Sequence, residues 1–488
     1  MTNSRILRAC GKIEQYSTSR HSLGIYRCVC NTCRYEASEP LDQQVWKAWI
    51  SEAIVSIIDS QPFLRVGIAG EDTNSPNFVH VTSIDLDNHV SWRTDTSKEG
   101  QDTTLLSAVE ERHNSLWPDI SNRPPWSVTI LGGEGNPQYV DVIFSWHHAI
   151  GDGLSGQMVQ KALLQALRET KIPAATEPAR SSILRYPERP VLPPPQEEAV
   201  NLSIGWWYML KTLWAEFRPA FLAPTPVTPW GGELINLERP YKTNVRLVTI
   251  DNETRNGLIT LCRMHGTTLT GLIQVLILAS FARQLPSEKS FTAQTPMSLR
   301  PYASTEGFDL SKTMLVLVTS LHHRFTPVIV SELQSLLSSS PSEGDTSLED
   351  KIWELAASIK GELKRKADEL PANDIMGLLQ WVSNWHERLK KADGTPRDTT
   401  WEVSNVGIIG DEGVAGKDVV RISRQVFSQS AIMTGPAMCA SVAGCQSSGS
   451  VSISLSWQEG VLDHNLVEGI KEDLEAWMRN LGTSGKLR

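Results

Sequence analysis

A proline-rich stretch near the middle of the chain limits how the chain can fold. Residues 173–200 read "PAATEPARSSILRYPERPVLPPPQEEAV". Proline fixes φ, lacks an amide donor and is excluded from helix interiors and central strands, so this stretch is predicted to be a semi-extended linker. The chain of 488 residues also exceeds the size at which one hydrophobic core stops growing, about 250–300 residues. We therefore expect two domains, or one body of two lobes, joined by this linker.

Helices and strands are mixed on both sides of the linker. In the first half, strands are predicted at 22–36, 78–86, 127–133 and 138–146, and helices at 41–62 and 153–168. In the second half, strands are predicted at 244–251, 292–302, 313–325, 401–409, 436–444 and 450–457, and helices at 267–285, 348–368, 374–391 and 465–481. Several strands follow one another directly, which indicates a mixed α/β (α+β) fold and not a regular βαβ wind. We divide the chain into an N-terminal lobe (1–172), a linker with a Trp-rich helix (173–235) and a C-terminal lobe (236–488).

Composition and charge exclude several classes of partner. The chain has 40% hydrophobic and 21% charged residues, a formal net charge of -9 and no basic stripe, so we expect no nucleic-acid partner. The first twenty residues are polar and charged, unlike a secretory signal peptide. The longest apolar run, 269–282, is shorter than the ~18 residues that a spanning helix needs. We expect a monomeric cytoplasmic protein without a membrane-spanning segment.

The seven cysteines are spread thinly over the chain, and we expect no structural disulfides. Three of them form the cluster "CVCNTC" (28–33), which has two interpretations. Read as metal ligands, the cluster lacks a fourth ligand nearby. Read as a strand, it places Cys28 and Cys30 on one face, where both pack as small apolar residues. We favour the strand and expect no metal site.

A second feature, residues 201–217, reads "NLSIGWWYMLKTLWAEF" and is predicted to be a helix rich in Trp. Such a helix fits a membrane surface or the flank of an apolar substrate channel. We favour a third interpretation, in which the aromatic side chains pack on the body of the protein.

The stretch "DVIFSWHHAIGDGLSGQ" (141–157) carries the strongest chemical signal. Alternate apolar residues indicate a strand that ends at a pair of histidines, followed by a loop and a helix that begins near Gly153. A neutral imidazole with a pKa of ~6.5 can take a proton from a hydroxyl and return it to a leaving group, which is the work of a general base. Asp152 also suits a helix N-cap, which is its structural interpretation.

Two further observations narrow the chemistry. No G-x-S-x-G nucleophile elbow is present, so a covalent acyl-enzyme is not indicated. A second histidine pair, His322–His323, is followed by no Asp-Gly, and we place it at the surface or at a strand end.

The string "HHAIGDG" (147–153) resembles the His-His-x-x-x-Asp-Gly motif of one acyltransferase superfamily. This superfamily includes chloramphenicol acetyltransferases, peptide-synthetase condensation domains, plant BAHD acyltransferases and fungal alcohol acetyltransferases. Three other stretches look like the fungal alcohol acetyltransferase branch: "GKIEQYSTSRHSLGIYRCV" (11–29), "NRPPWSVTIL" (122–131) and "WEVSNVG" (401–407). The resemblance runs from about residue 8 to 477, while the Asp-Phe-Gly-Trp-Gly motif of the BAHD branch is missing.

The resemblance implies a fold of two similar chloramphenicol-acetyltransferase-like lobes with an active-site tunnel at their interface. It implies that His148 is the catalytic base and His147 a supporting neighbour. Asp152 would be structural and would pair with an arginine of the other half, for which Arg300 in "TPMSLRP" is the match.

Other site residues follow from the same resemblance. Ser404 and Asn405 of "SNVG" would line the acyl-donor half of the tunnel. Gly153 and Gly407 would let the backbone approach a ligand closely. We also place Trp146 and Gly153 among the substrate-binding residues.

The implied function is acetyl transfer from acetyl-CoA to an alcohol in a ternary complex. The alcohol and acetyl-CoA would enter opposite mouths of the tunnel, and His148 would remove the hydroxyl proton during attack on the thioester. Sixteen Trp residues and the helix at 201–217 suggest a bulky apolar acceptor, such as a terpenoid or polyketide of secondary metabolism. Two alternatives stay open: a condensation-type amide or ester synthase that uses carrier-bound acyl groups, and a non-catalytic binding protein.

Overall fold

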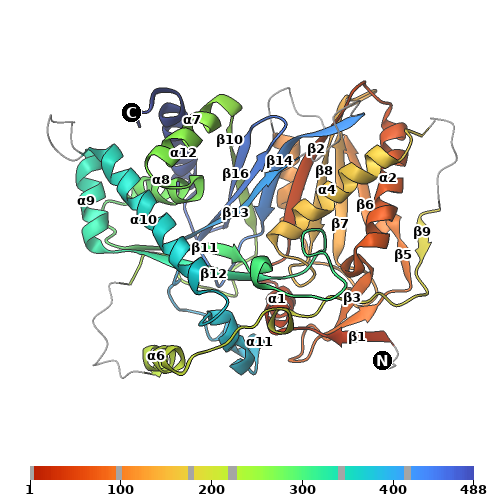
Figure 1. Ribbon diagram of the computed structural model, residues 1–488, viewed down its shortest axis with the longest axis horizontal. Helices are drawn as coiled ribbons and strands as arrows, with labels where there is room; N and C mark the ends of the chain where they lie inside the picture. Colours follow the sequence, from red (N-terminus) through yellow and green to blue (C-terminus); the bar gives the residue numbers. More distant parts are fainter. Residues whose placement is uncertain are drawn as a thin grey trace.

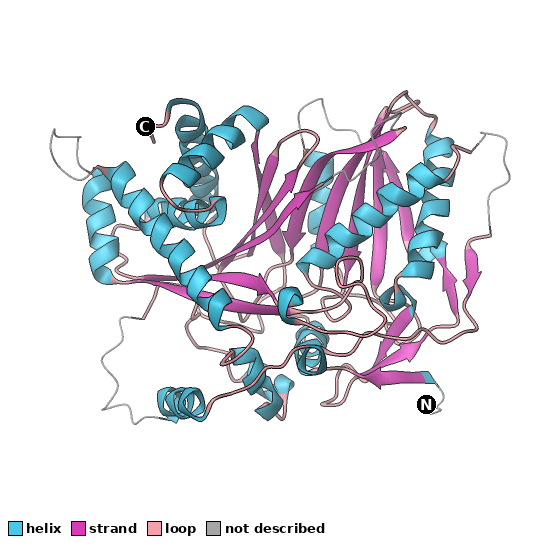
Figure 2. Cartoon of the chain, in the orientation of Figure 1, coloured by secondary structure: helices cyan, strands magenta, loops and turns pink. Residues whose placement is uncertain are grey.

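Two β-sheets, one beside the other, organise the molecule (Figures 1 and 2). The computed structural model describes residues 5–94, 102–173, 181–217, 228–338, 347–410 and 419–487. One sheet is built mainly from the first half of the chain and the other from the second half. Each sheet carries its own helices, so the structure consists of two lobes of mixed helices and strands.

The sheet of the first lobe has the strand order β14-β2-β8-β7-β6. Its strands are β2 (Val29–Ala37), β6 (Val90–Thr94), β7 (Trp126–Gly132), β8 (Tyr139–Trp146) and β14 (Val420–Gln429). Helices of this lobe are α1 (Lys12–Ser22), α2 (Gln43–Ser60), α3 (Thr103–His113) and α4 (Gly153–Glu169). Shorter strands are β1 (Ile6–Ala9), β3 (Val66–Ala69), β4 (Asn77–His80), β5 (Ser83–Asp85) and β9 (Ile183–Arg185). Strand β8 runs through the middle of the sheet, which makes its carboxyl end a rigid place for a loop.

The sheet of the second lobe has the order β10-β16-β15-β13-β11-β12. Its strands are β10 (Thr243–Ile250), β11 (Phe291–Ser298), β12 (Val318–Phe325), β13 (Trp401–Ile409), β15 (Met438–Cys445) and β16 (Val451–Gln458). Its helices are α7 (Asn252–Met264), α8 (Leu269–Gln284), α9 (Pro327–Ser338), α10 (Leu348–Glu369), α11 (Trp385–Lys390) and α12 (His464–Ser484). Helix α8 is apolar on nearly all sides because it is buried between the sheet and the neighbouring helices α9, α10 and α12.

Strand β14 ties the lobes together. It belongs to the second half of the sequence but pairs antiparallel with β2 of the first sheet, from Val420–Ala37 to Gln429–Val29. It also lies against β15 and β16 of the second sheet. This strand is not recognisable from the sequence. A bulge between Ile422 and Arg424 interrupts its alternation of apolar residues, and alternation is the signal by which a strand is recognised.

Other elements also differ from the sequence-based expectation, and helices α3, α7 and α9 are among those not predicted. Helix α1 was not predicted, because its buried face carries polar side chains and shows no apolar period. The helix expected at 374–391 is broken into a 3₁₀ helix, Ile375–Trp381, and the short helix α11. The strand expected at 313–325 begins only at Val318, and the preceding residues form an irregular segment beside helix α4.

The linker region includes helix α5 (Gln196–Ala199) and helix α6 (Trp206–Phe217). We expected the aromatic side chains of α6 to pack on the body of the protein, and this expectation is wrong. Trp206, Trp207 and Trp214 are 60%, 69% and 59% exposed, and Leu210 beside them is exposed as well. The half-buried face of α6 carries Tyr208 instead.

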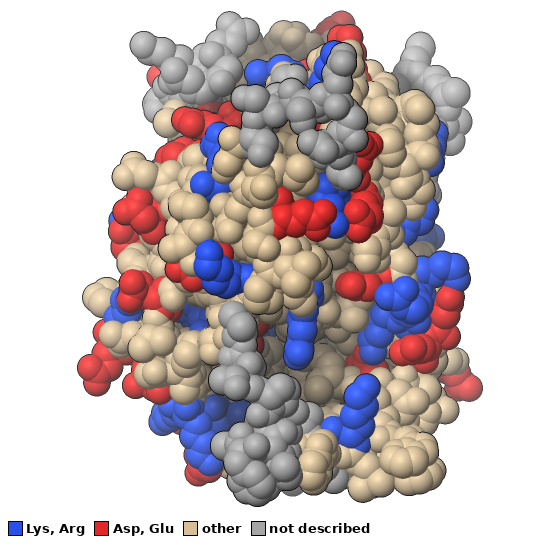
Figure 3. Space-filling model, turned by 90° about the vertical axis from the view of Figure 1, so that its left-hand side faces the viewer, with Lys and Arg blue, Asp and Glu red and all other residues tan. Residues whose placement is uncertain are grey.

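The last two features of the fold are the distribution of charged side chains on the surface and the length of the apolar helices. On the face shown in Figure 3, basic and acidic side chains are interspersed and form no continuous basic area. Among the described residues, no single helix is long and apolar enough to cross a bilayer. The pair α7 and α8 passes that test of length and composition together, but the two helices are bent by 97° at their junction.

Candidate active site

The two histidines of the motif lie in a tight loop between β8 and α4. Strand β8 ends at Trp146, and α4 begins at Gly153 with Asp152 as its N-cap. The indole nitrogen of Trp146 donates a hydrogen bond of 2.9 Å to the carbonyl of Gly151, which closes the loop on itself. A loop held this way between a central strand and a helix fixes the direction of each side chain in it.

His148 faces a cavity between the lobes. Its side chain is half-buried and lines the cavity. Nδ1 of the ring is fully buried and has no hydrogen-bond partner among the described residues, so Nε2 is the ring nitrogen that opens onto the cavity. The ring of Tyr26 lies beside it, with 5.7 Å between the ring centroids.

Burial, and to a smaller extent the positive charge of Arg20, lower the pKa of His148 to about 4. The carbonyl of His148 itself and the carboxylate of Asp152 act in the opposite direction. The imidazole is therefore neutral at physiological pH, which is the state in which it can accept a proton.

His147 points away from this cavity and into the protein. It is buried, and its ring packs edge-on against His21 with 4.8 Å between centroids. Its Nδ1 accepts a hydrogen bond of 3.0 Å from the amide of Ala149, so the ring proton of a neutral His147 lies on Nε2. Successive side chains at the end of a strand point to opposite sides, which explains why the two neighbours differ.

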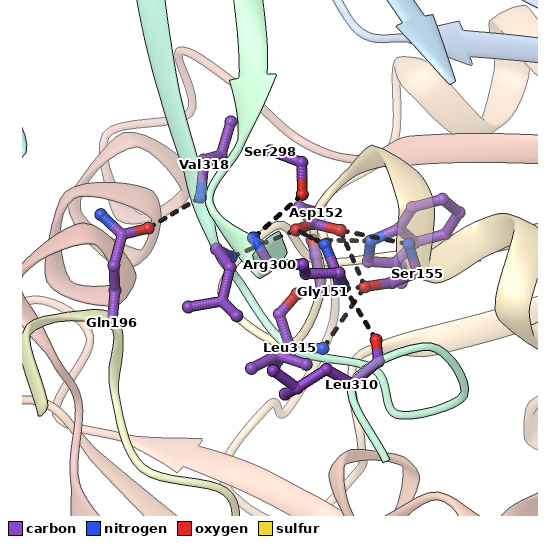
Figure 4. A network of polar contacts seen from close by, with 11 residues as sticks. Gly151, Asp152, Ser155, Gln196, Ser298, Arg300, Leu310, Leu315 and Val318 are labelled. Carbon is purple, nitrogen blue, oxygen red and sulfur yellow. Dashed lines mark hydrogen bonds and ion pairs between the residues drawn. The ribbon is translucent and has the colours of Figure 1, made fainter. Parts of the chain in front are cut away.

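Asp152 caps helix α4 and pairs with Arg300 of the second half (Figure 4). Its Oδ1 accepts hydrogen bonds of 3.1 Å from both the amide and the hydroxyl of Ser155. Its Oδ2 accepts one of 3.1 Å from the amide of Leu317 and lies 2.5 Å from Nη1 of Arg300. Four donors saturate this carboxylate, and the contacts fasten the start of α4 to the segment that precedes β12.

The cavity has a volume of about 560 Å³ and is lined by both lobes. The first lobe contributes side chains of α1, of the loop after it and of the histidine motif. The second lobe contributes residues of β11, β12, β13 and α11, and β14 brings Phe427 and Gln429 from the strand that joins the lobes.

Of the other residues expected at the site, two line this cavity and two do not. Gly153 and Ser404 are on its wall. Trp146 is fully buried and stacks on Phe144 behind the motif, so its place is the core and not this cavity. Asn405 is exposed and holds the bulge of β13 through hydrogen bonds to Thr270 and the amide of Gly407.

Gly407 has a different role from the one expected. Its φ is +80°, and no atom lies within 4 Å of the position that a Cβ would take. This glycine is therefore required by the backbone conformation of the bulge and not by close approach of a neighbour. At Gly153 a Cβ would lie 3.0 Å from Cζ of Phe427, so this glycine lets the side chain of Phe427 approach the backbone; its approach to a ligand stays a prediction.

A group of polar residues on the cavity wall was missed by the sequence analysis. It consists of Arg20, Tyr26, Gln294, Glu402 and Gln429. The amides of Gln294 and Gln429 each donate a hydrogen bond of 2.5 Å to the carboxylate of Glu402. Burial raises the pKa of Glu402, while these two amides and the charge of Arg20 act to lower it. A glutamate inside the apolar strand segment "WEV" was the one signal in the sequence that pointed to this group.

In the second histidine pair, as in the first, one side chain lines the cavity and the other is buried away from it. His322 lines the cavity. His323 is buried, with Nδ1 2.6 Å from a carboxylate oxygen of Glu362 and Nε2 3.0 Å from the hydroxyl of Thr295. The expectation that both histidines lie at the surface or at a strand end is wrong for His323.

Two groups of side chains among the described residues bring possible metal ligands within 4.8 Å of one another. One consists of His21, Glu71 and His147, in which both nitrogens of His21 already have partners, Glu71 and the amide of Trp117. The other consists of Cys28, Cys30 and His113. His113 joins the cysteines from helix α3, which is a contact that sequence spacing could not indicate. All seven cysteines are buried thiols.

The fold is that of the chloramphenicol-acetyltransferase-like acyltransferases. The structure is similar to that of the TRI3 trichothecene 15-O-acetyltransferase from Fusarium sporotrichioides, with a TM-score of 0.70 over 95% of this chain and 93% of that chain at 12% identity. It is also similar to the condensation domain of the Monacolin K polyketide synthase MokA, with a TM-score of 0.59 over 98% and 97% of the two chains at 12% identity. At this identity the likeness shows the shared two-lobed fold.

The family follows from the sequence. The family model for alcohol acetyltransferases matches residues 9–468, so the chain belongs to the alcohol acetyltransferase family. It is 29% identical to a protein of Fusarium pseudograminearum named "Probable alcohol acetyltransferase FCK4" over 499 aligned residues, which cover 99% of this chain and 96% of that protein. The chain is thus an acetyltransferase. Its candidate active site is the cavity that the histidine motif lines.

Proposed function

We propose that the protein transfers an acetyl group from acetyl-CoA to the hydroxyl of an apolar small molecule, with His148 as general base. The observation that carries this proposal is the position of His148. Its Nε2 opens onto a cavity shared by both lobes, while Nδ1 is buried. We assign the ring proton to the buried Nδ1, which leaves a lone pair on Nε2.

The reaction proceeds by direct transfer between two bound substrates. Nε2 of His148 takes the proton of the hydroxyl as its oxygen attacks the carbonyl carbon of the thioester. The tetrahedral oxyanion needs a hydrogen-bond donor, and we assign this role to the hydroxyl of Ser404, which lines the cavity. The carbon–sulfur bond then breaks, and the protonated His148 returns the proton to the CoA thiolate.

Asp152 and Arg300 have a structural role in the site. Their ion pair holds the loop that carries His148 between the lobes, as the contacts in Figure 4 indicate. His147 fixes the other side of the loop through its hydrogen bond to the Ala149 amide. None of these three residues takes part in the proton transfer that we propose.

The acceptor that we propose is a bulky apolar alcohol, such as a terpenoid or polyketide. The size of the cavity and its aromatic and aliphatic lining support this assignment, since sites for small molecules of this kind are mostly apolar with a few placed polar groups.

The test is an assay with purified protein, acetyl-CoA and a panel of terpenoid and simple alcohols, followed by release of free thiol. We expect thiol release that depends on an alcohol and produces one acetate ester per thiol. Transfer only from a carrier-bound acyl group would instead indicate a condensation-type synthase. Absence of transfer from either donor, with ligands still bound, would indicate a binding protein.

A further inference from the structure

Arg20 is a buried arginine on the wall of the cavity, one aromatic ring away from the proposed base. It lies in the last turn of α1 and is 6% exposed. Its guanidinium carbon is 4.2 Å from the ring centroid of Tyr16 and 4.3 Å from that of Tyr26. Tyr26 also contacts the ring of His148. The guanidinium is therefore stacked on rings beside the reacting position, where its direction is fixed.

This guanidinium has little to bind within the described part of the chain. Nη2 donates a long hydrogen bond of 3.4 Å to the hydroxyl of Ser17, Nε has no partner, and none of the described carboxylates forms an ion pair with it. Arg300, by contrast, has several partners. Its guanidinium pairs with Asp152 and donates further hydrogen bonds to the carbonyls of Leu310 and Leu315. A buried charge without partners is costly, so a residue like Arg20 indicates that a ligand completes its hydrogen bonds.

The polar neighbours of Arg20 on the cavity wall bond to one another. The amides of Gln294 and Gln429 each donate a hydrogen bond to one carboxylate oxygen of Glu402. The hydroxyl of Tyr26 donates a hydrogen bond of 3.3 Å to Oε1 of Gln429. These groups form a connected polar wall, and Arg20 lines the cavity beside them without a hydrogen bond to any of them.

We propose that Arg20 selects the acceptor: the alcohol carries a hydrogen-bond-accepting oxygen, a carbonyl or a carboxylate, within a few bonds of the hydroxyl that is acetylated. This inference rests on the proposed function and narrows its substrate class. Tyr26 sets the spacing, because its ring contacts both the guanidinium and the imidazole. The arginine keeps its proton throughout, and the acetyl transfer itself is unchanged.

The experiment uses alcohols that differ at one position only. 3-Hydroxycyclohexanone, 3-hydroxycyclohexanecarboxylate and 3-methylcyclohexanol are compared as acceptors for wild type, Arg20→Met and Arg20→Lys. Rates are measured at about pH 8, where His148 is neutral. Arg263→Met is the matched control, because Arg263 is exposed in the last turn of α7 and does not line the cavity. The ketone and the carboxylate serve as separate arms, so the preferred oxygen is identified.

We expect the wild type to prefer the ketone or the carboxylate over the methyl compound. Arg20→Met should lose about 10- to 100-fold in kcat/KM on the preferred acceptor, the usual range for a hydrogen bond to a charged group, and little on the methyl compound. Arg20→Lys should recover part of the loss, and Arg263→Met should behave like wild type. The KM for acetyl-CoA should not change.

Several outcomes would contradict the inference while leaving the proposed function intact. These are equal use of all three alcohols by the wild type, an equal loss on all three in Arg20→Met, or a raised KM for acetyl-CoA alone. A second readout needs no turnover. The Tm of His148→Ala should rise with the oxygen-bearing alcohol more than with the methyl compound, and the added Arg20→Met change should abolish that difference. Equal shifts, or no shift with any of the three, would also refute a role for Arg20 in recognition.

Discussion

The two adjacent histidines of the motif differ because they lie on opposite sides of the loop that follows β8. His147 is enclosed by His21 and the Ala149 amide, whereas His148 reaches the cavity. The identical residue types therefore have different environments, and only His148 combines access to a ligand with a neutral ring. This difference depends on the place of each residue relative to the strand, which the sequence could indicate only through the alternation of β8.

The pKa of His148 leads to a prediction for the pH dependence of the reaction. The base must be neutral, and its pKa is about 4, so kcat/KM should be constant from about pH 8 down to about pH 5 and fall as pH drops through about 4. Arg20 contributes to this low pKa, so Arg20→Met should raise the pKa of His148 and move the acid limb to higher pH. The measurement is a pH profile of kcat/KM with the methyl-substituted acceptor. Coincident acid limbs in the two proteins would show that Arg20 does not act on the base.

At the scale of elements, the start of α4 is fixed by contacts to the second half of the chain. Replacing Arg300 by Ala would leave the Asp152 carboxylate buried without its counter-charge, and breaking a buried pair in this way costs about 3–5 kcal/mol. We expect a lower Tm together with lower activity, measured by thermal unfolding and by the transfer assay. Lys364→Ala is the control, since its pair with Asp368 is exposed and such pairs contribute less than about 1 kcal/mol. An Arg300→Ala protein that melts like the wild type would show that the pair does not hold α4.

Helix α4 also depends on a close approach to β8. A Cβ on Gly156 would lie 2.4 Å from Cη2 of Trp146 and 2.7 Å from Cβ of Asn31. Gly156→Ala should therefore displace the helix, lower the stability by about 1–3 kcal/mol as overpacked cores do, and reduce activity by moving the loop that carries His148. The matched control is Gly361→Ala in α10, where the nearest atom would be Nη1 of Arg365 at 3.5 Å. That substitution should be neutral or stabilising by up to about 1 kcal/mol, and equal effects of the two changes on Tm would disprove the packing argument.

Particular elements show how far the sequence could predict this structure. The strand, loop and helix around 141–157 were predicted because their apolar periods are regular, and the fold class followed from the resemblance to which the motif led. Helix α1 was missed because it buries Ser17, Thr18 and Arg20 instead of an apolar stripe. The polar wall of the cavity was missed for the same reason. Polar residues that are buried for a ligand follow no hydrophobic period, and only tertiary structure brings them together.

At the scale of the whole molecule, β14 makes the two lobes dependent on each other. It completes the first sheet through β2 and lies on β15 and β16 of the second. We expect a single cooperative unfolding transition, despite a chain long enough for two independent domains. In calorimetry, Ile130→Val in the first lobe and Ile453→Val in the second should each shift the same transition downward, because both side chains are buried. Two separate transitions, with each substitution shifting only one of them, would contradict this coupling.

The proposed role of His148, as the base of an acetyl-CoA-dependent alcohol acetyltransferase, is tested by comparing wild type with His148→Ala. The kcat for alcohol-dependent thiol release and the Kd for acetyl-CoA are measured for wild type and His148→Ala. Because the imidazole lines the cavity without holding the fold together, the variant should remain folded and bind acetyl-CoA with little change. Its kcat should fall by about 10²- to 10⁴-fold, the usual contribution of a positioned general base. Full activity in a folded His148→Ala protein would contradict the account.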